Sequence, residues 1–185
     1  MSTPSAGEPR FPLEDLGNVS LDRYAVGKPD SFCYWLEFKT KELGSISGGS
    51  AAKFGVWRSK SEDRWRWNSM YQNEEDALAH IKDGLLALIG ATRAKQFDTL
   101  DKIGRALLGP NRYSLRSKPL YLYFPDDFLP ISNVEQVKQF LKQFGETPKG
   151  DLLALNRQLL ALLRALPQFE GFDAFQMMVF LYDTM

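Results

Sequence analysis

The feature that most constrains the fold is an unusually apolar segment near the C-terminal end, LLALNRQLLALLRAL (Leu152 to Leu166). Asp151 precedes it and Pro167 follows it, as expected for the two ends of a helix. Apolar residues cover so much of its circumference that the helix must be nearly buried. Other elements must therefore pack around it. No apolar run in the sequence approaches the ~18–20 residues needed to cross a bilayer.

Apolar residues at helical spacing predict further helices on both sides of the sequence midpoint. Strand signals come earlier, where aromatic and β-forming residues alternate with a glycine-rich loop and a charged turn. We expect an antiparallel meander of three strands at 32–40, 51–59 and 64–71, and one buried strand at 119–124 after a connector at 109–117. We expect helices at 73–92, 98–108, 132–144, 152–166 and from 173 onward.

These elements predict an α/β fold in the broad sense (α+β), in which an antiparallel sheet with packed helices is followed by a mostly helical subdomain. We expect a poorly ordered or loosely packed leader over residues 1–30, because prolines, glycines and serines are frequent there. Residues 31–110 would then form a sheet-plus-helix module. Residues 111–185 would form a mainly helical subdomain. The apolar helix with which the sequence stops suggests a piece of a longer polypeptide.

Charge and reactive residues exclude several classes of protein. The chain has 23 basic and 23 acidic residues, so it is not a uniformly basic nucleic-acid coat protein. Its one cysteine, Cys33, has no intrachain disulfide partner, which is typical of a reducing, cytoplasmic compartment. Its one histidine, His80, lies in a predicted helix without a nucleophile motif. We therefore expect no catalytic residue, no metal site, no cofactor and no membrane association.

One segment combines aromatic and basic residues. All four tryptophans fall between residues 32 and 71, and basic residues outnumber acidic ones between residues 31 and 72. Basic residues contact phosphates and aromatic faces stack on exposed bases. Candidates for DNA-backbone contacts are Lys53, Arg58, Lys60, Arg64 and Arg66, and candidates for a base pocket are Trp57, Trp65, Trp67 and Tyr71. The alternative is that the tryptophans fill the core and the arginines face solvent.

Two other patterns resemble functional motifs only superficially. The glycine loop at 44–50 has the glycine spacing of a P-loop, but Ser50 stands where the lysine must be. It is either a flexible hairpin connection or a loop whose amides approach DNA phosphates. Asp30, Glu37 and Lys39 resemble the metal site of restriction-type nucleases. Asp30 and Glu37 are too close in sequence to lie on adjoining ends of two paired strands.

The C-terminal half resembles the segment before the AAA+ motor in McrB-like restriction proteins. The resemblance rests on KPLYLYFPDDFLPI (118–131), VKQFLKQFG (137–145) and LNRQLLALLRALPQFEGFDAFQMMVFLY (155–182). Further upstream, AAKFGVWRSKSEDRWRW (51–67) and the helix beginning NEEDALAHI (73–81) resemble the sheet-then-helix portion that reads DNA in that family. The motifs of the motor itself do not occur in this sequence.

This resemblance implies a DNA-recognition region without catalysis of its own. Its expected partner is double-stranded DNA, preferably with a modified (methylated) cytosine that is flipped out of the duplex. It also implies a GTPase or ATPase motor in the same polypeptide and a separate nuclease subunit. The alternative is a protein-interaction or structural adaptor whose helical half docks onto the motor without contacting DNA.

Overall fold

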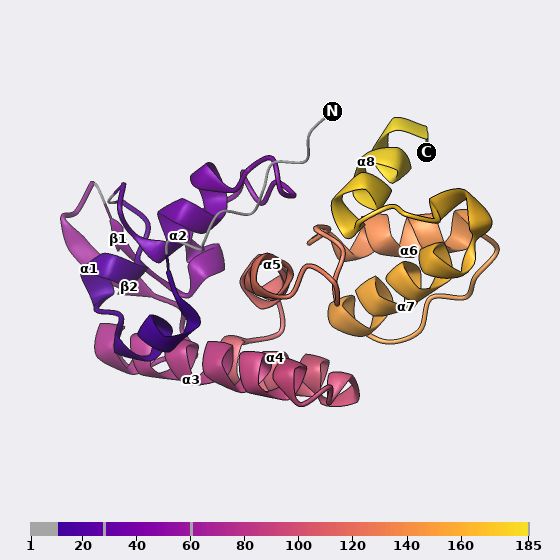
Figure 1. Ribbon diagram of the computed structural model, residues 1–185. Coiled ribbons are helices and arrows are strands. Elements are labelled where there is room, and N and C mark those ends of the chain that lie inside the picture. Colours follow the sequence, from indigo (N-terminus) through magenta and orange to yellow (C-terminus); the bar gives the residue numbers. More distant parts are fainter. Residues whose placement is uncertain (1–10, 28, 60, 185) are drawn as a thin grey trace.

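The computed structural model describes residues 11–27, 29–59 and 61–184. The fold is α+β, with a two-stranded antiparallel sheet and packed helices, as the sequence predicts. Strands β1 (Val56–Ser59) and β2 (Arg64–Trp67) form a hairpin beside the short helices α1 (Leu21–Tyr24) and α2 (Phe32–Tyr34) (Figure 1). Helices make up most of the rest of the chain.

Five predicted helices are confirmed, with small shifts at their ends. Their bounds are α3 (Glu74–Arg93), α4 (Leu100–Leu108), α6 (Val134–Gln143), α7 (Leu152–Ala165) and α8 (Ala174–Thr184). The side chain of Asn73 caps α3, accepting a hydrogen bond of 2.8 Å from the backbone N–H of Asp76. Asn133, and not Ser132, caps α6. These caps explain why the helices begin where the sequence predicts them.

The expected strand at 32–40 is wrong. Residues 32–34 are α2, and a π-helical turn (Trp35–Lys39) continues it. The Ser31 hydroxyl accepts a hydrogen bond from the N–H of Tyr34 and starts the helix. Phe32, Cys33 and Leu36 are completely buried, so burial of one helical face outweighs the β-propensity of the aromatic residues. Of the three expected strands, only parts of the second and third form.

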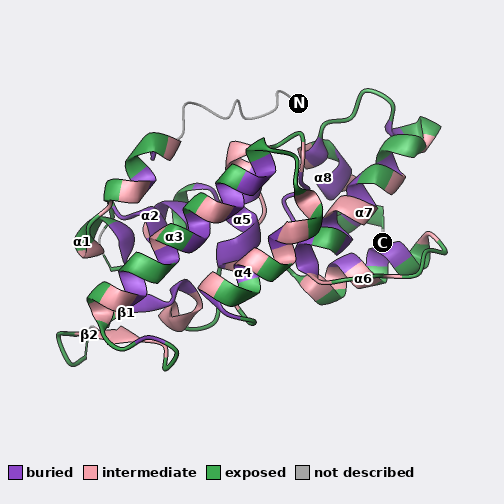
Figure 2. Ribbon diagram, turned by 90° about the horizontal axis from the view of Figure 1, so that it is seen from below, coloured by how far each residue is buried: buried purple, intermediate pink, exposed green. Residues whose placement is uncertain are grey.

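The expected strand at 119–124 is also wrong, and most of the expected connector is helical. Helix α5 (Tyr113–Tyr123) spans both, with Pro119 inside it. This helix lies in the middle of the molecule, between the N-terminal part and helices α6 to α8 (Figure 1). Residues 115–121 are buried on every side of α5, which Figure 2 shows in purple. A helix that is buried on all sides has no solvent-exposed face. Its sequence therefore does not show the alternation of apolar and polar residues at helical spacing from which helices are predicted.

Part of the expected leader packs against the core. Residues 13–18 form a 3₁₀ helix (Leu13–Asn18), and α1 follows it. Phe11, Leu16 and Tyr24 are each no more than 3% exposed and belong to the core. The Tyr24 hydroxyl donates a hydrogen bond of 2.7 Å to the carbonyl oxygen of Phe54. Residues 1–10 lie outside the described residues.

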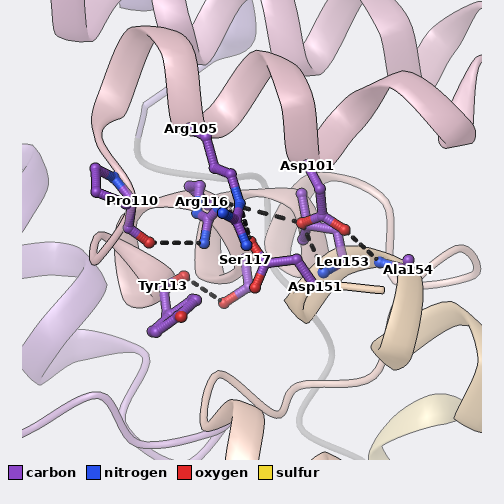
Figure 3. A network of polar contacts seen from close by, with 9 residues as sticks. All are labelled: Asp101, Arg105, Pro110, Tyr113, Arg116, Ser117, Asp151, Leu153 and Ala154. Carbon is purple, nitrogen blue, oxygen red and sulfur yellow. Dashed lines mark hydrogen bonds and ion pairs between the residues drawn. The ribbon is translucent and has the colours of Figure 1, made fainter. Parts of the chain in front are cut away.

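A buried arginine joins α4, α5 and α7 (Figure 3). The Arg116 guanidinium is fully buried and donates to Asp151 at 3.0 Å and to the carbonyl oxygen of Pro110 at 3.2 Å. It also lies 4.9 Å from the centre of the Tyr113 ring. Gly104 of α4 makes room for it, because a Cβ atom there would lie 2.4 Å from Cδ of Arg116. The arginine therefore fixes the spacing of three helices.

Replacing Arg116 by alanine should lower the free energy of unfolding by about 3–5 kcal/mol, because it leaves the Asp151 carboxylate without its buried partner. Chemical denaturation measures the loss. Arg105→Ala is the matched control, since Arg105 also binds Asp151 but its side chain is 55% exposed. Its effect should be much smaller. Equal losses for the two variants would show that the buried pair has no special role.

Candidate nucleic-acid interface

The register of the β1–β2 hairpin decides which candidate residues share a face. Trp57 lies opposite Arg66, and Arg58 lies opposite Trp65. Directly opposed residues of an antiparallel pair point to the same face, and neighbours along a strand alternate. Trp57, Arg64 and Arg66 therefore share one face. Arg58, Trp65 and Trp67 share the other. Each of the two central pairs joins a tryptophan to an arginine.

The two faces of the hairpin have different surroundings. Trp65 and Trp67 are partly buried and pack against the hydrophobic core, on the same face as the completely buried Val56. Trp57 lies on the opposite face and is also partly buried. Arg64 and Arg66 thus lie on the opposite face from Trp65 and Trp67, as the two-residue period of a strand requires. The structure does not bring the three tryptophans together into one cluster.

Glu62 in the hairpin turn holds both outward arginines. Its carboxylate accepts hydrogen bonds from Arg64 at 3.1 Å and from Arg66 at 2.7 and 2.6 Å. Hydrogen bonds from Arg66, and then from Arg64, lower the pKa of Glu62 to about 2. All three side chains are solvent-exposed. The face therefore carries two arginines around one carboxylate, in a place where a phosphate could replace that carboxylate.

A pocket of about 120 Å³ lies beside the other face, between α1 and the hairpin. Trp65 forms part of its wall, and the Arg58 guanidinium lies 5.7 Å from the centre of the Trp65 ring. Arg58 also pairs with Asp63 at 3.0 Å. The remaining lining residues are Asp22, Ala25, Val26, Gly27 and Ser59. An aromatic wall, apolar side chains and carboxylates thus meet in one small pocket.

Two other candidates, Lys53 and Tyr71, lie outside the two strands of the hairpin. Lys53 donates to Glu37 and to the carbonyl oxygens of Ile46 and Gly48, so its ammonium is engaged within the protein. Tyr71 is buried, and its hydroxyl has no hydrogen-bond partner. Lys60 lies outside the described residues. No sequence signal singles out Glu62 or Asp63, although both lie in the turn of the predicted hairpin.

The glycine loop is held by a buried lysine of α5. Lys118 donates to the carbonyl oxygens of Thr40, Leu43 and Gly44 at 2.7, 2.5 and 2.6 Å. Burial lowers the pKa of Lys118 to about 7. The Gly44 backbone has φ +89°, and a Cβ atom there would collide with the carbonyl oxygen of Pro130. The start of the loop is therefore fixed against α5 and the segment after it.

The nuclease-like triplet does not form a strand face, because Glu37 and Lys39 lie on the π-helical turn. Glu37 is 8% exposed and paired with Lys53. Within the described ranges, no three histidine, cysteine or acidic side chains lie close enough together to hold a metal ion. No helix in the described part of the chain has the length and apolarity required to cross a membrane.

In comparisons with known proteins, no family model, no curated protein and no solved structure matches the chain.

Lys118 should make stability depend on pH. Its pKa is about 7 in the folded protein and 10.5 in an unfolded chain, so the unfolded state binds more protons between these values. Below pH 7 the lysine is charged in both states, and burying this charge lowers the free energy of unfolding by its full cost. This cost decreases as the pH rises toward 10.5. Wild-type stability should therefore rise, relative to Lys118→Met, when denaturation is measured from pH 7 to pH 9. Parallel profiles for the two proteins would contradict this prediction.

Proposed function

We propose that this chain is a DNA-binding targeting domain of a McrB-like restriction system that reads modified cytosine by base flipping. It would act in the cytoplasm, next to a motor domain and a nuclease subunit that carry out the chemistry. The observation that carries the proposal is the pairing of Trp57 with Arg66 and of Arg58 with Trp65 across the hairpin. Each pair offers a stacking surface and a cation within a few ångströms of each other.

Phosphate binding would occur on the face with Arg64 and Arg66. Both arginines are exposed, and their present partner is the single carboxylate of Glu62. Two oxygens of a phosphate, like the two oxygens of a carboxylate, can accept two parallel hydrogen bonds from a guanidinium. Binding is then an exchange in which DNA displaces Glu62 from the arginines. The carboxylate lowers the net charge of the face and makes non-specific binding weaker.

The pocket beside Trp65 would receive the flipped base. Flipped bases are read by stacking on aromatic or apolar walls and by hydrogen bonds to the Watson–Crick edge. Trp65 supplies a wall, and Ala25 and Val26 supply apolar surface for a methyl group. The N4 amino group of cytosine is a donor that carboxylates accept well, and Asp22 and Asp63 both line the pocket. The pocket thus offers a complement to the ring face, the methyl group and the N4 amino group of a methylated cytosine.

An adaptor function is the second candidate, and it is favoured by apolar side chains exposed in the C-terminal part. Val179 and Tyr182 of α8 are 38% and 47% exposed, and Phe172 just before the helix is 39% exposed. Exposed apolar side chains that gather on one element are typical of protein-interaction surfaces. The surface would dock onto the motor. An electrophoretic shift assay separates the two candidates, because a pure adaptor would bind neither methylated nor unmethylated duplex.

If a DNA phosphate displaces the Glu62 carboxylate from the two arginines, two variants should have opposite effects on the affinity for DNA. Replacing Arg64 and Arg66 together by alanine should weaken binding of all duplexes about equally and should reduce the dependence of affinity on salt, because fewer counterions are released. Glu62→Gln should increase affinity and make the salt dependence steeper. Titrations at several salt concentrations measure both. If affinity and salt dependence are unchanged in the two variants, the arginines do not contact DNA.

If the pocket beside Trp65 receives the base, replacing each tryptophan by alanine should affect DNA selectivity and stability differently. Trp65→Ala should remove most of the preference for methylated duplex while phosphate-driven binding persists, because base–aromatic stacking contributes ~1–3 kcal/mol. Trp57→Ala, on the opposite face, should keep the preference. Trp67→Ala should lower stability by about 2–3 kcal/mol through lost packing.

Melting temperature measured beside affinity separates lost stacking from lost folding. A 2-aminopurine next to the modified base should brighten on binding if the base leaves the stack. If no folded variant loses the preference and the fluorophore stays dark, base flipping is wrong and the domain reads the groove or the shape of DNA.

A further inference from the structure

A second and larger pocket, of about 450 Å³, lies where the glycine loop meets the N-terminal ends of α5 and α6. Its polar lining comes from three separate parts of the chain. These side chains are Ser45, Ser47, Lys53, Arg112, Ser114 and Ser132, with two asparagines beside them. None of the described residues that line the pocket is acidic. The pocket therefore combines hydroxyl groups with two cationic side chains, of which Lys53 is already paired with Glu37 and Arg112 is not paired with a carboxylate of the described residues.

Arg112 is the residue that makes this pocket unusual. Arg58, Arg66 and Arg116 each pair with a carboxylate. Arg112 is partly buried, and among the described residues no carboxylate lies within ion-pair distance of its guanidinium. Its Nε atom is shielded from solvent and has no hydrogen-bond partner. Burial lowers the pKa of Arg112. A shielded cation is costly unless an anion accompanies it.

The first turn of α5 adds donors to the same pocket. Arg112 is its N-cap, no side chain caps the helix, and the first turn contains no acidic residue. The first backbone N–H groups of a helix have no partner within the helix and favour an anion. By contrast, the Asn133 side chain already accepts hydrogen bonds from the first turn of α6. Arg112 and the first residues of α5, Tyr113 and Ser114, thus line the same pocket.

Lys53 organises the pocket without offering free donors. Its ammonium donates to Glu37 and to two carbonyl oxygens of the glycine loop, Ile46 and Gly48. Lys118 holds the start of the same loop through Thr40, Leu43 and Gly44. Two lysines therefore fix the loop that carries Ser45 and Ser47. The hydroxyl groups of Ser45 and Ser47 lie 2.6 Å from each other, and both serines line the same pocket as Arg112.

We propose that this pocket binds a phosphate ester, with Arg112 as its cation and the first-turn amides of α5 and nearby serines as further donors. A guanidinium binds phosphate through two parallel hydrogen bonds, and a tetrahedral phosphate can accept from several directions at once. The volume exceeds what a phosphate group fills, so the remainder can hold the group that it esterifies. The ester is either a mononucleotide or a phosphodiester of DNA. The proposal does not depend on the function proposed for the hairpin.

The test uses the full chain and isothermal titration with three probes: inorganic phosphate, deoxycytidine monophosphate and acetate. We expect saturable binding of the two phosphates, tighter for the nucleotide, and much weaker binding of acetate. Absence of saturable binding of both phosphates, or equally tight binding of acetate, would overturn the proposal.

Ser114→Asp is the most informative variant, because it places a carboxylate beside Arg112 at the N-terminal end of α5. An acidic residue there stabilises a helix, so the variant should stay folded. Nucleotide affinity should fall about tenfold or more, since the new carboxylate occupies the guanidinium. Gln168→Glu, an exposed position outside the pocket, adds the same charge and should leave affinity unchanged.

Arg112→Gln, checked for folding by its melting curve, should also lower nucleotide affinity about tenfold or more. Wild-type affinity in both folded variants would overturn the assignment of the site.

Competition identifies the source of the phosphate. If an unmodified duplex displaces the nucleotide, and Ser114→Asp weakens duplex binding, the pocket takes a DNA phosphodiester. If the nucleotide stays bound in the presence of duplex, the pocket takes a mononucleotide. Both results support a phosphate-ester site. Failure of the hairpin function leaves the nucleotide titration unchanged, so the two proposals fail independently.

Discussion

Helix α5 places two cationic side chains, Arg116 and Lys118, in the interior of the fold. The arrangement of the other elements depends on the groups that accept hydrogen bonds from these two charges. Arg116 is compensated by the Asp151 carboxylate at the start of α7. Lys118 has no carboxylate partner among the described residues and is held by three backbone carbonyl groups between residues 40 and 44. Because buried charges are costly without such partners, the loop and α7 must both lie against α5. The two cations thereby connect the N-terminal and C-terminal parts of the fold.

Amphipathic elements could be predicted from the sequence, and completely buried ones could not. Helices α3 and α6 have a polar face, a capping asparagine and a clear helical period. Helix α5 has none of these, and its buried residues include Arg116, Ser117 and Lys118, which usually indicate a surface. Its aromatic residues, together with Pro119, therefore predicted a strand. Only the partners contributed by distant parts of the chain make a helix possible there.

Some features of the candidate sites could likewise be predicted from the sequence, and others could not. The alternation of tryptophan and arginine on β2 follows from the two-residue period of a strand, so it could be predicted. The displacement of Trp57 to the opposite face from Trp65 depends on register, which no local signal determined. The sequence also could not show that Glu37 would engage Lys53, 16 residues away, or that Arg112 would have no ion-pair partner among the carboxylates that the structure describes. Both facts are properties of the assembled core.

The close approach at Gly104 has a consequence for how this chain tolerates change. Even a methyl group at that position would overlap the Cδ atom of Arg116. An alanine would push the guanidinium away from Asp151, and the effect would reach α7 through that carboxylate. A substitution in α4 would thus weaken an ion pair at the start of α7. The absence of a side chain at Gly104 is therefore a condition for the ion pair between Arg116 and Asp151.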